Sequence, residues 1–203
     1  MTAVGPTLAT SRPETPAAAV RLAGLSGVVG GILLLLAFVV EIPPLLNNVR
    51  LTMFFVGAMA VAAAAYPALA RTGLGVARVA VGLVLVANAW GLAMGAISAA
   101  FSIPVGPGTF GVVYFWAGLA WWLADALFGF AALRLGGWAR VGPLALGIGS
   151  LLAITGMDRL ELTTSDNPTI FLPLSLIGIA LNGVGWIVLG FSLALRREAR
   201  IAA

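Results

Sequence analysis

Cysteine, histidine and lysine are all missing from the 203 residues of this chain. Without cysteine there are no disulfide bonds, no thiolate nucleophile and no thiolate-held metal ion. Without histidine there is no imidazole ligand for haem, copper or zinc, and no imidazole proton shuttle. Without lysine no Schiff base can hold a chromophore. We therefore expect neither a metal ion nor a cofactor in this protein.

Charged residues make up only 9% of the chain, whereas 61% is hydrophobic and the mean hydropathy is +1.09. A soluble domain carries about 25% charged and roughly 45–50% apolar residues. The composition therefore excludes an ordinary soluble domain and predicts an integral membrane protein, whose main partner is the lipid bilayer. The net charge of +4 is due to eleven arginines. Arginines in a membrane protein typically mark its cytoplasmic side, so we expect no nucleic-acid partner.

Six apolar stretches approach or exceed the length of about 20 residues that a helix needs to cross a bilayer. The connections between these stretches are short and contain prolines and glycines, which end helices. The sequence predicts an all-α bundle of six transmembrane helices in one domain, residues 21–203, after a flexible cytoplasmic tail over residues 1–20. The predicted spans are residues 22–42, 51–70, 76–100, 111–133, 141–157 and 170–195, of which the fifth is the shortest.

Arginines are distributed very unevenly between the two sides of this predicted bundle. Nine lie in the tail, in the second-to-third and fourth-to-fifth loops and at the C-terminus, whereas only Arg50 and Arg159 lie on the other side. The positive-inside rule then places both termini in the cytoplasm. A chain rich in Ala, Gly and Arg that lacks lysine is typical of a GC-rich bacterial genome. We therefore expect a multi-pass protein of a bacterial cytoplasmic (inner) membrane.

Polar side chains are concentrated near the middle of the spans. Asn88 is at the centre of the third span, Asn182 is at the centre of the sixth, and Asp125 is three residues from the centre of the fourth. Ser150 is close to the centre of the fifth. These residues share helix faces with small residues, and such faces pack against other helices in membranes. We expect Asn88, Asp125 and Asn182 to converge, and the small-residue faces also offer surfaces for homo- or hetero-oligomers.

Asp125 is the most informative single residue. A carboxylate at this depth costs several kcal/mol, so it normally faces the bundle interior and has a partner. No arginine lies within two helical turns of the centre of any span. Two interpretations follow. In one, Asp125 is a proton donor or acceptor that acts on a ligand; in the other, it fastens the bundle through hydrogen bonds to Asn88 or Asn182.

Four tryptophans lie at a similar depth. Trp121 and Trp122 precede Asp125 by four and three residues, so both rings lie on its side of the helix. Indole rings, two amides and one acid form a pocket suited to a small apolar molecule with a polar end, or to an organic cation. The predicted ligand-binding residues around Asp125 are Asn88, Trp90, Trp121, Trp122, Asn182 and Trp186.

Three classes of function remain open from the sequence. The first is a protein that binds or transports a small apolar or cationic molecule. The second is a cofactor-free intramembrane enzyme, in which Asp125 performs acid catalysis of the kind used by terpenoid cyclases or isomerases. Such enzymes usually pair two acids, and Asp125 is the only deep one here. The third is a non-catalytic structural or accessory subunit.

Overall fold

The computed structural model describes residues 17–39, 44–73, 75–101, 109–135, 140–155 and 171–195. Within these ranges the chain is helical, and one helix corresponds to each predicted span. The prediction of an all-α fold is therefore confirmed for the described residues. The helices are α1 (Ala17–Val39), α2 (Pro44–Ala70), α3 (Gly75–Phe101), α4 (Thr109–Ala132), α5 (Val141–Ile154) and α7 (Phe171–Leu195), with a short 3-10 helix η1 (Leu133–Leu135) after α4.

Five of the helices are long and apolar enough to cross a membrane, and α5, with 14 residues, is shorter. The chain is a multi-pass helical membrane protein. The orientation of its termini stays a prediction, because residues 1–16 and 196–203, with four of the nine arginines, lie outside the described residues. Arg50 was expected in the outer connection just before the second span; it lies inside α2, near the start of that helix, and is buried.

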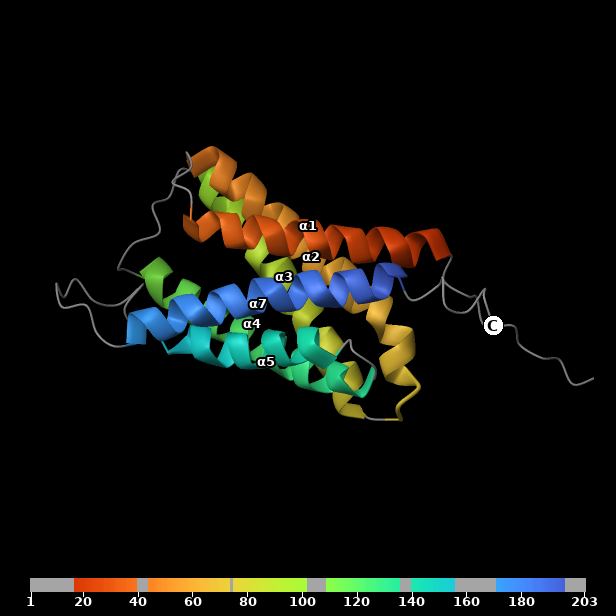
Figure 1. The fold of residues 1–203 in the computed structure, drawn as a ribbon. Coiled ribbons are helices and arrows are strands. Elements are labelled where there is room, and N and C mark those ends of the chain that lie inside the picture. The colour runs from red at the N-terminus through yellow and green to blue at the C-terminus, as the bar shows by residue number, and fades with distance from the viewer. Residues whose placement is uncertain are drawn as a thin grey trace, which may run out of the picture.

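The packing contacts between the helices follow the order of the chain and close into a ring. Figure 1 shows α7 lying between α1 and α5. Each helix packs against its neighbours in sequence, because short connections make successive helices antiparallel neighbours. The contact between α1 and α7 closes the ring. We call the end at which α2, α4 and α7 begin the outer end, after the predicted orientation.

Proline and glycine define several of the helix ends, as the sequence indicates. Helix α2 begins at Pro44, and Pro143 and Pro173 lie in the first turns of α5 and α7, where the missing N–H leaves no bond unmade. Gly73, with φ of +73°, forms the turn after α2. Helix α2 continues through Pro67, and the kink expected at that residue stays a prediction.

Glycines allow the backbones on one side of the ring to approach very closely. A methyl group added at Gly24 on α1 would lie 2.5 Å from the carbonyl oxygen of Gly190 on α7. A methyl group at Gly149 on α5 would lie 2.5 Å from the backbone nitrogen of Asn182 on α7. Only glycine fits at such contacts. The small-residue faces predicted for these helices therefore do mediate helix packing, as is usual in membranes.

Candidate functional site

Asp125 lies in the middle of the apolar span Trp116–Leu135, and its side chain is fully buried. It is the only carboxylate in the part of the chain that the structure describes. The neighbouring helix α5 and the facing helix α7 carry no charged residue within their bounds. The carboxyl group is therefore surrounded by neutral groups of α5 and α7, and its interactions with them determine what it can do.

Two N–H donors of α7 reach the same oxygen of Asp125. Asn182 Nδ2 donates to Asp125 Oδ2 at 3.1 Å, and the indole Nε1 of Trp186 donates to it at 3.2 Å. The other oxygen, Oδ1, is buried and has no hydrogen-bond partner among the described residues. The prediction that Asp125 and Asn182 meet inside the bundle is confirmed, and one oxygen of the acid is left for a further partner.

The close contact of α5 with α7 explains why these groups meet. Asn182 and Trp186 are four residues apart and share one face of α7. Asn182 Nδ2 also donates to Ser150 Oγ at 2.9 Å, and that hydroxyl donates to the carbonyl oxygen of Leu146 at 2.7 Å. Ser150 follows Gly149, whose missing side chain lets α5 lie directly against the backbone of Asn182. The amide of Asn182 is thus held between an acid and a hydroxyl.

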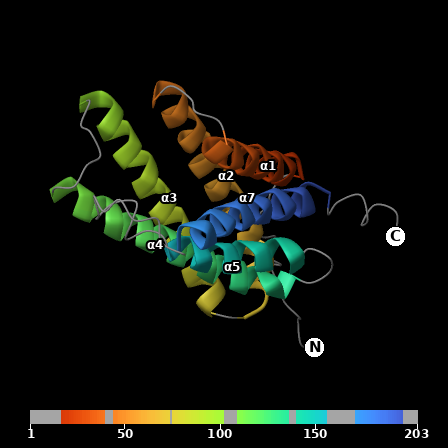
Figure 2. The ribbon, with the colours of Figure 1, turned by 60° about the vertical axis from the view of Figure 1, so that its left-hand side comes forward.

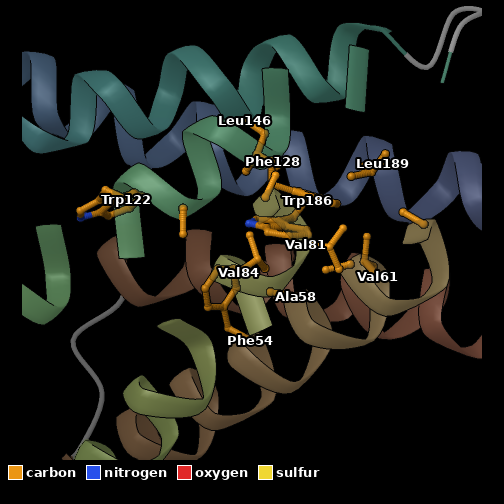
Figure 3. Packing of buried hydrophobic residues seen from close by; sticks show 14 of the residues in the cluster. Phe54, Ala58, Val61, Val81, Val84, Trp122, Phe128, Leu146, Trp186 and Leu189 are labelled. Carbon is orange, nitrogen blue, oxygen red and sulfur yellow. The ribbon is translucent and has the colours of Figure 1, made fainter. Parts of the chain in front are cut away.

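Aromatic rings from three helices surround this polar group. The ring of Trp186 stacks on that of Phe128 of α4, with centroids 5.6 Å apart and planes inclined by 16°. The ring of Phe54 of α2 meets Trp186 edge to face at 6.5 Å. Figure 3 shows Trp186 at the centre of the packed residues, with Phe128 on one side and Phe54 on the other. The acid therefore lies beside an apolar, π-rich interior.

Trp121 and Trp122 extend the aromatic group toward the outer end. The ring of Trp121 packs edge to face on Phe54 and Phe55 of α2, at 5.6 and 5.5 Å. Its Nε1 atom is buried and has no hydrogen-bond partner in the described structure. Trp122 is buried against Trp121, with ring centroids 4.3 Å apart, and it lies apart from Trp186 in Figure 3. Trp121 therefore belongs to the aromatic group around the acid, whereas Trp122 lies at its edge.

Trp90 lies on the other side of α3. Its side chain is 48% exposed, and it shares an outward stripe with apolar residues at helical spacing. The members of this stripe are Val76, Val79, Leu83, Val86 and Trp90. Depth alone placed Trp90 in the predicted pocket. The structure does not bring it to Asp125, because the side of a helix on which a residue lies depends on its angular position as well as its depth.

Asn88 is fully buried on the inner face of α3, as expected. Its Nδ2 atom donates to the carbonyl oxygen of Val84 on the same helix at 2.8 Å, and its Oδ1 atom has no partner among the described residues. The structure therefore gives no hydrogen bond between Asn88 and Asp125. The amide oxygen is a second buried acceptor that is left without a donor in the described structure.

Ser150, Phe54 and Phe128 were absent from the predicted site. Ser150 had a usable signal, since it is polar and near the middle of its span beside a small-residue face. Phe128 had a weaker one, because it follows Asp125 by three residues and so shares its face. Phe54 had none, because nothing in an apolar span distinguishes one phenylalanine from another.

The described residues contain no group of three or more His, Cys, Asp or Glu side chains that would hold a metal ion. The chemistry available at the site is that of one acid, two amides, a hydroxyl and aromatic faces. No protein family, no curated protein and no solved structure matches this chain.

Proposed function

We propose that the protein binds a small organic cation at Asp125, as a carrier of such molecules across the membrane. The observation that supports this proposal is the state of the Asp125 carboxyl group. It is fully buried, its Oδ1 atom has no hydrogen-bond partner among the described residues, and no basic side chain lies on α5 or α7.

A buried charge is costly unless a charge of opposite sign or a hydrogen-bonding group compensates it. The N–H groups of Asn182 and Trp186 satisfy Oδ2 alone. A cation beside Oδ1 would compensate the remaining charge of Asp125. In an empty site a proton on the carboxyl group does the same. Asp125 thus acts as proton donor and acceptor: it releases a proton when the cation binds and takes one up when the cation leaves.

The aromatic residues favour an organic cation over a neutral apolar molecule. Faces of Trp and Phe attract cations, by about 2 kcal/mol or more in a desolvated site. The ring of Phe54 contacts the rings of both Trp121 and Trp186, and Trp186 is hydrogen-bonded to the carboxyl group. A wholly apolar molecule would leave Oδ1 without a partner, whereas a cation with an apolar body uses the acid and the rings together.

The enzyme hypothesis has less support from the structure. Acid catalysis of the cyclase or isomerase type usually employs two carboxyl groups, and Asp125 is the single one in the described ranges. The accessory-subunit hypothesis makes a different claim, that the cluster is only a fastening between helices. It predicts that the neutral isostere Asp125→Asn behaves as the natural protein does in every binding measurement.

The experiment is a titration of the purified protein in detergent with tetraphenylphosphonium, followed by tryptophan fluorescence. Saturable quenching is expected for the natural chain. Asp125→Asn should weaken binding by about tenfold or more, which corresponds to 1.4 kcal/mol. Ser192→Ala is the matched control, because Ser192 of α7 is, like Asp125, a buried polar residue, but its hydrogen bond in the described structure is to the carbonyl of Val188 on its own helix. Equal affinities for the natural chain and Asp125→Asn would overturn the proposal.

A further inference from the structure

The inner face of α3 has open space at a position where the rest of the bundle is tightly packed. A methyl group added at Gly95 would meet nothing within 4 Å. Methyl groups at Gly149 or Gly190, on α5 and α7, would meet backbone atoms at 2.5 Å. The two sides of the ring are thus built differently: backbone contact joins α5 and α7, and α1 and α7, while α3 leaves a gap at Gly95.

Gly95 faces the interior and not the lipid. It follows Asn88 by seven residues, two helical turns, so both lie on the same face of α3. Asn88 and Val84, on this face, are fully buried. Gly95 itself is only partly exposed, in contrast to Trp90 on the outward stripe. The open space at Gly95 therefore lies on the inward side of the helix.

Between Gly95 and the acid lie groups that are suited to a ligand. The three atoms nearest to a methyl group added at Gly91 all belong to the ring of Phe55, the closest at 2.7 Å, so a side chain and not backbone makes the closest contact there. Phe55 in turn packs on Trp121, which lies one turn from Asp125 on α4. Asn88 Oδ1 and Trp121 Nε1 are both buried without a hydrogen-bond partner among the described residues.

The arrangement of the helices agrees with this placement. Figure 2 shows the outer ends of α2, α3 and α4 spread apart, whereas α1 and α7 lie close together. Gly95 lies on the outer half of α3, since that helix runs from Gly75 to Phe101 toward the outer end. The open space is thus on the side of the bundle where the helices diverge.

We propose that a hydrated access chamber lies between α2, α3 and α4 in the outer half of the bundle and takes up the apolar body of the cation on its way to Asp125. Its lining is Phe55, Asn88, Gly91, Gly95 and Trp121. The chamber opens at Gly95. Asn88 Oδ1 and Trp121 Nε1, both buried without a partner among the described residues, are the polar atoms at its inner end that entering water or a ligand would bond. The identity of the ligand rests on the proposed function, whereas the hydration of the chamber does not.

The absence of cysteine makes the chamber directly testable by labelling of single cysteines. Each variant is purified in detergent and treated with a water-soluble, charged methanethiosulfonate reagent. Gly95→Cys should react about tenfold faster or more than either control, because only a hydrated thiol forms the reactive thiolate readily. The controls are Ala80→Cys, fully buried on the inner face of α3, and Ala96→Cys, exposed on its outward side. Tetraphenylphosphonium should slow the reaction of Gly95→Cys.

A second pair of variants tests the chamber by filling it. Gly95→Phe should weaken tetraphenylphosphonium binding by about tenfold. Ala96→Phe, one residue along on the outward side, should leave binding unchanged. Reaction of Gly95→Cys no faster than that of Ala96→Cys would overturn the chamber. Fast reaction without protection, in a protein whose fluorescence titration shows binding, would overturn its use by the cation. Fast reaction in a protein that binds no cation would support the chamber and overturn the proposed function alone.

Discussion

The indole nitrogen of Trp186 lies 3.2 Å from Asp125 Oδ2 and donates a hydrogen bond to it. The two residues lie on α7 and α4, which are not neighbours along the ring, because α5 packs between them. The bond therefore joins α7 to α4 through the interior of the bundle, on the inner side of α5. Asn182 also links this acid to Ser150 of α5. A change in the charge or position of Asp125 therefore alters hydrogen bonds that connect α4, α5 and α7.

The first prediction concerns what Asp125 contributes to stability. Asp125→Asn keeps a side-chain oxygen that accepts from Asn182 and Trp186, and its N–H₂ group replaces Oδ1, which has no hydrogen-bond partner among the described residues. We expect its thermal unfolding in detergent to match that of the natural chain. Asp125→Leu removes both acceptors and should destabilise by about 0.5–2 kcal/mol, the range of interhelical hydrogen bonds in membranes. A large loss of stability in Asp125→Asn would show that the fold needs the acid itself.

The second prediction separates the hydrogen bond of Trp186 from its packing. Trp186→Phe keeps a ring against Phe128 but removes the donor, and should destabilise by about 0.6 kcal/mol and at most about 1.7. Trp186→Ala also empties a fully buried volume and should cost about 3–5 kcal/mol. Trp90→Ala is the control, because Trp90 is 48% exposed and should change stability by no more than about 0.5 kcal/mol. Equal effects at both tryptophans would contradict the structure.

The contrast between these tryptophans shows what a single sequence can predict of the site. Hydropathy predicts the spans, and the position of a residue within a span predicts its depth. The side of the helix is predicted only where neighbours at spacing three and four share a property. On α7 small and polar residues repeat in this way, so Asn182 was correctly placed inside. On α3, Asn88, Gly91 and Gly95 repeat in the same way. Trp90 is two residues from Asn88 and so about 200° around the helix, which turns it outward; depth alone misplaced it.

Partners across the bundle are harder to predict than depth. The sequence indicated that Asp125 needs a neutral partner and named two, Asn88 and Asn182. In the structure Asn182 donates a hydrogen bond to Asp125, whereas the amide of Asn88 donates to the carbonyl oxygen of Val84 on its own helix. The close approach of α5 to α7 at Gly149 positions Asn182, and it depends on the relative rotation of the two helices, which the hydrophobic pattern does not determine.

The third prediction uses that close approach. A methyl group at Gly149 would lie 2.5 Å from the backbone nitrogen of Asn182, so Gly149→Ala should destabilise by about 1–3 kcal/mol as α5 and α7 move apart. Gly82→Ala on α3 has nothing within 4 Å of the added methyl and should be neutral or stabilising by up to about 1 kcal/mol, since alanine favours a helix over glycine. Thermal unfolding of both variants checks the sign of each change. Destabilisation of equal size would contradict the packing at Gly149.

The fourth prediction is the orientation of the chain in the membrane. Whether α5 crosses the membrane decides on which side the C-terminus lies. Its 14 residues span about 21 Å at 1.5 Å per residue, which is less than the hydrocarbon thickness of about 30 Å. A full crossing therefore needs residues beyond its described end, as the predicted span 141–157 supplies. The arginines favour a crossing, because Arg134 and Arg140 precede α5 whereas only Arg159 follows it before the sixth span.

Reporter fusions decide between a crossing and a re-entrant α5. Fusions at residues 75 and 137 should report the cytoplasm, and fusions at 105 and 165 the opposite side. If α5 does not cross, residues 137 and 165 lie on the same side, and α7 carries the C-terminus to the side opposite the N-terminus. That result would contradict the structure, because α7 packs antiparallel on α5, with Gly142 beside Leu189 and Gly178 beside Ala153, and so begins at the same end as α4. It would also place three of the nine arginines, those at positions 196, 197 and 200, outside. The positive-inside rule opposes such an arrangement, so we expect residue 165 to be outside and the C-terminus in the cytoplasm.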